Sequence, residues 1–205
     1  MQLWLSSGLL VLSYLIGSIP MGFLFVKLFT GKDVRAVQSG RTGGTNAMRA
    51  AGLGVGIITS FADIAKGMSG VWLARRFAPG NAWLEILCPF FIVVGHNYSL
   101  YLIQKDEHGW KINGGAGGTP SVGGAIGLWP PLFFLLVPLG ALILFGVGYA
   151  SVATMSIPMI AALIFAYRSI AGLGSSTWYH VLYCFLVEAL ILWALRPNIR
   201  RLIKG

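Results

Sequence analysis

The chain has 205 residues, of which 56% are hydrophobic and only 10% charged, and its mean hydropathy is +0.76. This composition excludes an ordinary soluble domain and indicates a membrane protein, organised as one integral-membrane domain over residues 1–205. The net charge of +9 does not indicate a nucleic-acid partner, because the cations are scattered in short loops between apolar stretches, where they suit anionic lipid surfaces.

The first apolar stretch carries no charge from Met1 through Val26. It lacks a positively charged start and is longer than the apolar part of a signal peptide, so we predict a retained membrane helix over residues 3–26. Two further helices are predicted over residues 52–74 and 84–103. Cys88 and Cys184 both lie in apolar stretches without disulfide or metal spacing, so we predict that both are buried, and we predict no metal or cofactor.

The longest uncharged run extends from Ile112 to Tyr167, which is 56 residues. About 20 apolar residues span a bilayer as a helix, so this run can hold at least two crossings. Pro130 and Pro131 interrupt it, because adjacent prolines remove backbone donors and clash with the preceding turn. We therefore predict helices over residues 120–129, 132–149, 152–167 and 177–195. The predicted fold is all-α, a polytopic membrane bundle of about seven transmembrane helices.

Seven crossings place the two termini on opposite sides of the membrane. One side then collects three basic residues, Arg75, Arg76 and Arg168. The other side collects eleven, namely Lys27, Lys32, Arg35, Arg41, Arg49, Lys105, Lys111, Arg196, Arg200, Arg201 and Lys204. Because cytoplasmic loops carry the excess of Lys and Arg, this count predicts a cytoplasmic C-terminus and an outside N-terminus.

Most of the unusual polar residues lie in three segments on the predicted cytoplasmic side. The first segment, residues 38–49, combines glycines with Ser39, Thr45 and Asn46 as neutral donors and with Arg41 and Arg49 as cations. Glycines let successive backbone N–H groups converge on an anion, and arginine can contact phosphate with two parallel donors. A flexible basic loop without a binding role is the equally supported alternative.

The second segment begins at Gly95-His96-Asn97-Tyr98 and ends in the glycine cluster Gly114–Gly118, which Thr119 follows. The cluster has the composition of a phosphate cradle, but it lacks the strand and the Lys-Ser/Thr ending of a nucleotide-binding loop. His96 is interpreted either as a site residue or as a helix-end histidine. The stretch Lys105–His108 between them is predicted to be a solvated hairpin.

The third segment, residues 196–202, places basic side chains at the end of the last helix, where they suit the helix C-terminus and anionic headgroups. Three further ionisable residues fall inside predicted helices. Asp63 and Lys66 are three residues apart on one helical face, so we expect them to pair, either for structure or to order the first segment. Glu188 is expected to face the interior of the bundle.

Together these segments resemble the bacterial membrane-bound acyl-phosphate–glycerol-3-phosphate acyltransferase family, in order and over nearly the whole chain. The first family motif, G-S-G-N-x-G-A-T-N-x-x-R, is matched by Ser39, Gly40, Gly43, Thr45, Asn46 and Arg49. The second motif, G-H-x-Y…G-G-K-G, is matched by Gly95, His96, Tyr98, Gly114, Gly115 and Gly117, and the third by Asn198 and Ile199. Residues 17–22 and 63–67 are also similar to the family's first two helices.

The chain departs from the family pattern at several positions. Arg41 and Gly44 stand where the first motif has asparagine and alanine, and a longer hairpin follows Tyr98. Ala116 replaces the lysine of the glycine loop, and Leu195 replaces the histidine of the third motif. Arg41 and Lys111 are the candidates to supply the missing cation.

The resemblance implies an enzyme that transfers a fatty acyl group from acyl phosphate to the 1-hydroxyl of glycerol-3-phosphate, forming lysophosphatidic acid in phospholipid biosynthesis at the cell inner membrane. It implies catalytic roles for Ser39, Arg49 and Asn198. It implies substrate binding by Arg41, Thr45, Asn46, His96, Lys111, Gly114, Gly115, Gly117 and Gly118. The expected partners are the two substrates and membrane lipids.

A basic, glycine-lined pocket that is open to lipid suits two anionic head groups and one apolar tail. No Ser-His-Asp arrangement is apparent in the sequence, so we expect direct attack on the acyl phosphate, without an acyl-enzyme. Two alternatives remain open. One is a catalytically impaired relative that binds anionic lipid or phosphate, because Ala116 and Leu195 remove two polar groups. The other, with less support, is a small-anion transporter, for which Asp63, Lys66 and Glu188 are the only hint.

Overall fold

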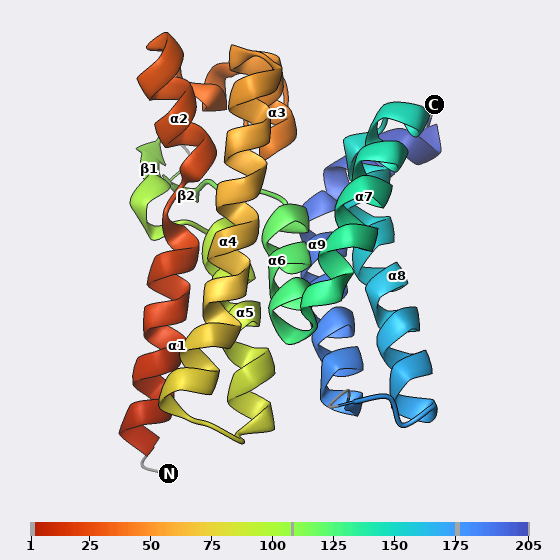
Figure 1. The fold of residues 1–205 in the computed structure, drawn as a ribbon. Coiled ribbons are helices and arrows are strands. Elements are labelled where there is room, and N and C mark those ends of the chain that lie inside the picture. Colours follow the sequence, from red (N-terminus) through yellow and green to blue (C-terminus); the bar gives the residue numbers. More distant parts are fainter. Residues whose placement is uncertain (1–2, 108, 175–176, 205) are drawn as a thin grey trace.

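The computed structural model describes residues 3–107, 109–174 and 177–204, and most of them are helical (Figure 1). The helices, 3-10 turns and strands in chain order are α1 (Leu3–Ser18), α2 (Met21–Thr30), η1 (Val34–Ala36), α3 (Gly44–Ala51), α4 (Leu53–Phe77), α5 (Ala82–Asn97), η2 (Leu100–Leu102), β1 (Ile103–Asp106), β2 (Gly109–Ile112), α6 (Gly118–Leu128), η3 (Pro130–Leu132), α7 (Phe133–Val147), α8 (Ala150–Ile170) and α9 (Trp178–Lys204).

The predicted first helix is in fact two helices, α1 and α2, which follow one another along one side of the molecule (Figure 1). The break falls at Ile19 and Pro20, because proline has no backbone donor and its ring clashes with the preceding turn. The break leaves the carbonyl of Ile19 free to accept a hydrogen bond from Lys66 Nζ at 2.9 Å. The prediction of one continuous helix was wrong at the point where the chain contacts a buried charge.

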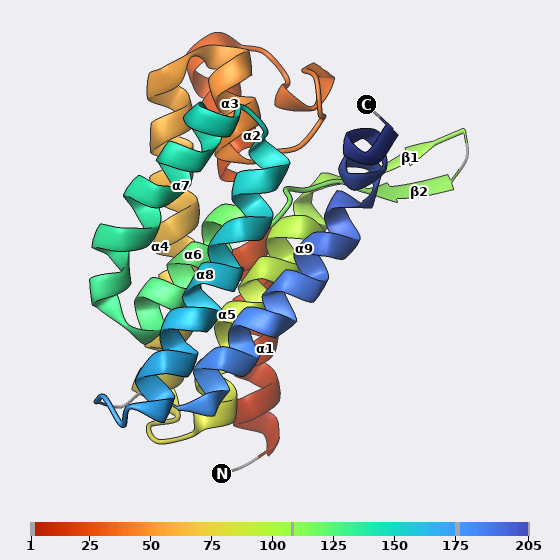
Figure 2. The same cartoon turned by 90° about the vertical axis from the view of Figure 1, so that its right-hand side faces the viewer.

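The other predicted helices are present, most of them with small shifts, and α3 is an unpredicted addition inside the first polar segment. The last helix extends to Lys204, well beyond its predicted end at residue 195, so the third polar segment is helical. The predicted helix over residues 84–103 ends earlier, at Asn97, and the chain continues into the two-stranded hairpin of β1 and β2. These strands are antiparallel, with Ile103 opposite Ile112. The hairpin prediction is thus confirmed for residues 105–107, while His108 lies outside the described residues. Figure 2 shows the hairpin projecting from the bundle beside the end of α9.

The proline pair does turn the chain as predicted, since α6 ends at Leu128 and α7 begins at Phe133 after the single turn η3. The α6 helix is short and begins part of the way along the bundle (Figure 1). Close packing holds it against α4. A Cβ on Gly67 would overlap the backbone of Pro120, and a Cβ on Gly123 would overlap the backbone of Ile64, so glycine is required at both contacts.

Within the described residues, five helical stretches are long and apolar enough to cross a membrane: Leu3–Thr30, Ala82–Leu102, Pro130–Val147, Ala150–Ile170 and Trp178–Ile203. The two other predicted crossings, α4 and α6, are not among them. The α4 helix contains Asp63 and Lys66 and ends in two arginines, and α6 has only 11 residues. The protein has a polytopic, largely helical membrane fold, and the count of seven crossings stays a prediction.

Candidate active site

A buried group of ionisable side chains lies between α4 and α5. Lys66 Nζ lies 3.0 Å from Asp63 Oδ1 and 3.2 Å from His96 Nδ1, and the side chains of all three residues are at most 3% exposed. The pairing of Asp63 with Lys66 is therefore confirmed. Removing one partner from such a pair typically costs roughly 3–5 kcal/mol, because the other charge is left buried without compensation. His96 belongs to this group as well as to the helix end.

The glycine loop, Gly114–Gly118, is fixed on this group. The Gly115 amide donates to the His96 carbonyl at 2.8 Å, and a Cβ on Gly115 would overlap the His96 imidazole. Of the loop residues only Gly117 has a positive φ, at +89°. Glycine is therefore required at position 115 by the contact with His96, and not by a positive φ.

The three backbone amides that follow Gly115 differ from the Gly115 amide in their hydrogen bonding. Among the described residues, no backbone carbonyl accepts a hydrogen bond from the amides of Ala116, Gly117 or Gly118. Gly118 is also the first residue of α6, where the unpaired N–H groups of a helix carry partial positive charge. This end of the loop has the donors that an anion requires.

The starts of three helices meet at one cavity beside this loop. Gly44 begins α3, Gly118 begins α6 and Ala150 begins α8, and all three line a cavity of about 100 Å³ that we call the reaction pocket. Arg41 and Arg49 also line it, and none of the described residues in its wall is acidic. Three helix N-termini and two guanidinium groups together favour a bound anion such as phosphate.

The reaction pocket brings together most of the residues that were predicted for the site. Its wall includes Ser39, Arg41, Thr45, Asn46, Arg49, His96, Gly117, Gly118 and Asn198. Lys111, Gly114 and Gly115 line a neighbouring cavity instead. Lys111 therefore does not replace the missing loop lysine in the reaction pocket, whereas Arg41 reaches the pocket. Ala116 and Leu195, which replace the lysine and the histidine of the family pattern, also line the pocket.

Arg41 joins three segments of the chain. Its Nη1 donates to the carbonyl of Gly115 at 3.2 Å, and its Nη2 donates to the carbonyl of Ala194 in α9. Burial lowers the pKa of the Arg41 guanidinium, and the nearby charge of Arg201 lowers it further. Since the usual pKa of arginine is above 12, the side chain remains a cation at neutral pH.

Asn46 lies in the pocket wall, but its side-chain donors are used differently from the prediction. Its side chain is buried, and Nδ2 donates to the carbonyls of Val34, Val37 and Arg41 at 2.9–3.0 Å. Both amide protons are thereby directed at the loop, so Asn46 holds the shape of the first polar segment and has no proton left to offer a ligand.

Sequence reasoning missed the contribution of α8. Ser151 and Thr154, in the first turns of α8, line the reaction pocket together with Thr119 of α6. These residues lie in or near the long uncharged run and belong to no recognised motif. The sequence does show hydroxyl side chains near the start of this helix. Hydroxyl residues are so common at helix starts that they do not identify a site.

An apolar groove of about 430 Å³ adjoins the reaction pocket, and its wall comes mainly from α3, α4, α6, α7 and α8. The two cavities share Gly44, Thr45, Gly118, Thr119, Ala150 and Thr154. The rest of the groove is largely apolar, with residues such as Ile57, Phe61, Leu144 and Phe145. A ligand with an anionic head and an apolar tail can therefore occupy both cavities at once.

The chain is similar to known proteins in both sequence and fold. The family described as glycerol-3-phosphate acyltransferase matches residues 7–205. A glycerol-3-phosphate acyltransferase of Syntrophomonas wolfei is 32% identical over 97% of this chain and 94% of the relative, and one of Thermus thermophilus is 35% identical over 96% and 90%. The crystal structure of PlsY, an integral membrane glycerol 3-phosphate acyltransferase, in its glycerol 3-phosphate form superposes with a TM-score of 0.80 at 26% identity, covering 98% of this chain and 92% of that one.

Proposed function

This chain belongs to the glycerol-3-phosphate acyltransferase family, and we propose that it transfers a fatty acyl group from acyl phosphate to the 1-hydroxyl of glycerol-3-phosphate. The products are lysophosphatidic acid and inorganic phosphate. The protein is an integral-membrane acyltransferase of phospholipid biosynthesis. Family membership supports an active enzyme over an impaired relative or a transporter.

One observation carries the proposal, the shared wall of the reaction pocket and the apolar groove. Acyl phosphate has an anionic group and a fatty chain on either side of its reactive carbonyl carbon. With the phosphate among the three helix N-termini and the chain in the groove, the carbonyl lies at the border, near Thr45 and Thr119. Glycerol-3-phosphate then enters from the polar side, where Arg49 and Asn198 line the pocket.

The reaction is a direct acyl transfer. The 1-hydroxyl oxygen of glycerol-3-phosphate attacks the carbonyl carbon, a C–O ester bond forms, and the bond between the carbonyl carbon and the phosphate oxygen breaks. The leaving phosphate takes the bonding electron pair, and the hydroxyl proton passes to a phosphate oxygen. The protein contributes mainly by positioning the two anions against their mutual repulsion and by stabilising the charge that develops on the phosphate.

Four of the predicted site residues, Ser39, Arg41, Arg49 and Asn198, have a role in this scheme. Arg49 holds a substrate phosphate with two donors, and Arg41 supplies the cation that the glycine loop lacks at Ala116. The hydroxyl of Ser39, which accepts a weak hydrogen bond from the Arg41 amide at 3.4 Å, contacts the attacking hydroxyl. The carboxamide of Asn198 orients glycerol-3-phosphate from α9.

The proposed topology has seven crossings in the inner membrane, an outside N-terminus and an active site that faces the cytoplasm. The start of α1 and the end of α9 lie at opposite ends of the molecule (Figures 1 and 2). Helices α2 and α3 lie at the same end as the end of α9. Arg75 and Arg76 in the last turn of α4 and Arg168 in the last turn of α8 belong to the other end, which has fewer basic residues. This asymmetry supports the orientation through the positive-inside rule.

The experiment that tests the function uses the purified full chain in neutral detergent with acyl phosphate and glycerol-3-phosphate. We expect phosphate release that depends on glycerol-3-phosphate, together with lysophosphatidic acid detected by mass spectrometry. Absence of lysophosphatidic acid while the chain remains folded would reject the proposal.

A further inference from the structure

A second polar cavity lies next to the reaction pocket, and the acyl transfer makes no use of it. Its volume is about 950 Å³, and it lies between the first polar segment, the hairpin and the end of α9. We call it the basic vestibule, because six cations line it: Arg35, Arg41, Lys111, Arg196, Arg200 and Arg201. The vestibule and the reaction pocket share only Ser39 and Arg41.

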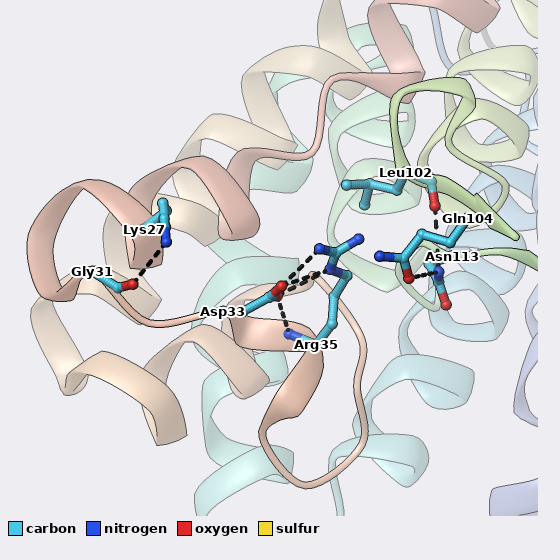
Figure 3. Close-up of polar contacts among 7 residues, drawn as sticks. All are labelled: Lys27, Gly31, Asp33, Arg35, Leu102, Gln104 and Asn113. Atoms are coloured by element: carbon cyan, nitrogen blue, oxygen red, sulfur yellow. Dashed lines mark hydrogen bonds and ion pairs between the residues drawn. The ribbon is translucent and has the colours of Figure 1, made fainter. Parts of the chain in front are cut away.

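The positive charge of the vestibule is largely uncompensated by the protein. None of the described residues in its wall is acidic. Among the described residues, only Arg35 of the six cations has an ion pair, with Asp33 at 2.7 Å, and Figure 3 shows this contact beside the hairpin. Hydrogen bonds from Arg35 lower the pKa of Asp33, so the carboxylate stays ionised and neutralises that one arginine. The other five cations have no carboxylate partner among the residues that the structure describes.

The arginines of α9 are held in place without using all of their donors. Arg196 Nε donates to the carbonyl of Trp193 at 2.9 Å, and its guanidinium lies 3.3 Å from the centre of the Trp193 ring. Arg201 Nε donates to the carbonyl of Pro197 at 3.3 Å. Each of these contacts uses Nε, and the Nη groups are therefore available for the paired donation that suits a phosphate.

The floor and rim of the vestibule are also ordered. Asn113 Nδ2 donates to the carbonyl of Leu102 at 3.3 Å and to Gln104 Oε1 at 3.1 Å, which ties the base of the hairpin together (Figure 3). The backbone amide of Ser99 donates to the carbonyl of Asn113 at 3.1 Å. The hairpin therefore holds Lys111 in a braced strand opposite α9.

Several like charges around one cavity repel one another, and exposed cations that face a common space favour a multivalent anion as counter-ion. Inorganic phosphate carries one to two negative charges near neutral pH and a phospholipid phosphodiester carries one, and both present oxygen acceptors in the geometry that guanidinium groups recognise. We propose that the basic vestibule is a second phosphate-binding site, separated from the reaction pocket by Arg41. It takes a phosphate group from either of two sources, free inorganic phosphate or the headgroup of an anionic phospholipid.

This proposal does not rest on the acyl-transfer reaction, because the first measurement is binding. The test variant is Arg200→Gln/Arg201→Gln, which changes two vestibule residues outside the reaction pocket. The matched control is Lys32→Gln/Arg76→Gln, which removes the same charge from two exposed residues that line neither cavity. The unfolding temperature of each purified full chain in neutral detergent is followed over a phosphate titration, with chloride at equal ionic strength as reference.

A second arm distinguishes the lipid source. The same proteins are placed in nanodiscs of phosphatidylcholine with or without phosphatidylglycerol, and retained phosphatidylglycerol is counted by native mass spectrometry. For free phosphate as the source, we expect the test variant to need roughly 10-fold more phosphate for the same stabilisation, a loss of about 1.4 kcal/mol. For a lipid source, we expect the test variant to retain less phosphatidylglycerol.

The control should behave like the wild type in both arms. If the test variant matches the control with phosphate and also with phosphatidylglycerol, the vestibule binds neither, and the proposal is overturned. Acyl-transfer rates at low phosphate should be the same in the test variant and the wild type, so a failure of the vestibule proposal is distinguishable from a failure of the proposed reaction.

Discussion

Arg41 Nη1 lies 3.2 Å from the carbonyl oxygen of Gly115, and this hydrogen bond joins the first polar segment to the glycine loop 74 residues further along the chain. The same guanidinium reaches Ala194 of α9, so one side chain positions three parts of the site. It also forms the common wall of the reaction pocket and the basic vestibule. Substitutions at Arg41 should therefore affect catalysis through both charge and geometry.

Arg41→Gln should lower kcat/KM for acyl phosphate by roughly 10-fold or more, about 1.4 kcal/mol, because the pocket loses a cation that its glycine loop does not otherwise provide. Ala116 lines the same pocket. Ala116→Lys should therefore recover part of the loss in the Arg41→Gln background, as measured by steady-state kinetics. If Ala116→Lys instead lowers kcat/KM by the same factor in the wild type and in Arg41→Gln, Arg41 and position 116 do not share a role.

Arg49→Lys keeps the charge of a side chain that lines the reaction pocket but removes the two parallel donors of the guanidinium. We expect kcat/KM for glycerol-3-phosphate to fall by roughly 10-fold or more. Arg76→Lys, at the end of α4 and outside the pocket, is the matched control and should have wild-type kinetics. Unchanged kinetics in Arg49→Lys would refute the phosphate contact.

Gly115→Val should abolish turnover, and the structure adds that it should also destabilise the fold, because a Cβ at this position overlaps the His96 ring. The smaller Gly115→Ala should cost about 1–3 kcal/mol in unfolding free energy, in the range of an overpacked core. If the clash is with His96, that cost should shrink in a His96→Ala background, which a double-mutant cycle of thermal unfolding measures. A cost that is independent of residue 96 would contradict the contact.

Cysteine labelling tests the topology. Single cysteines are introduced as Ser39→Cys and Ile203→Cys in a background of Cys88→Ala/Cys184→Ala. Each should react with a membrane-impermeant maleimide only after the cells have been permeabilised, which gives the reagent access to the cytoplasmic side. Both positions are exposed at the side chain, and both belong to segments on the predicted cytoplasmic side. Labelling of either position in intact cells would reject the orientation.

Much of the helical arrangement follows from the sequence, because apolar length and the proline pair at 130–131 determine where a chain can cross and turn. The pairing of Asp63 with Lys66 was predictable for a similar reason, since their spacing places both on one helical face. The break at Ile19 and Pro20 was not predicted, although Pro20 stands in the sequence, because the uncharged stretch continues past it to Val26. The hydrogen bond from Lys66 to the Ile19 carbonyl is a long-range contact that forms only in the folded bundle. Helix α3 was missed because it has only eight residues and begins directly after the glycine-containing first polar segment turns at Gly43, and its stability comes from packing against α2 and α4.

The candidate site was likewise only partly predictable from the sequence. The motif residues Ser39, Arg49 and Asn198 were assigned from the sequence, and they do line one pocket. The sequence offered no reason to prefer Arg41 or Lys111 as the replacement for the missing loop lysine. That choice depends on the path of the hairpin, which places Lys111 outside the reaction pocket. Asn46 was read as a ligand donor, but its amide is used by three backbone carbonyls. Ser151 and Thr154 could not be assigned, because the packing of α8 against α6 is a long-range contact.

Direct attack at the border of the reaction pocket and the apolar groove is the central claim, and a pre-steady-state measurement tests it most directly. The enzyme is mixed with acyl phosphate in the absence and presence of glycerol-3-phosphate, and phosphate, lysophosphatidic acid and the mass of the intact protein are followed. We expect no phosphate burst and no acylated protein without glycerol-3-phosphate, and one phosphate for each lysophosphatidic acid when it is present. A stoichiometric burst of phosphate with an acylated protein in the absence of glycerol-3-phosphate would contradict the mechanism.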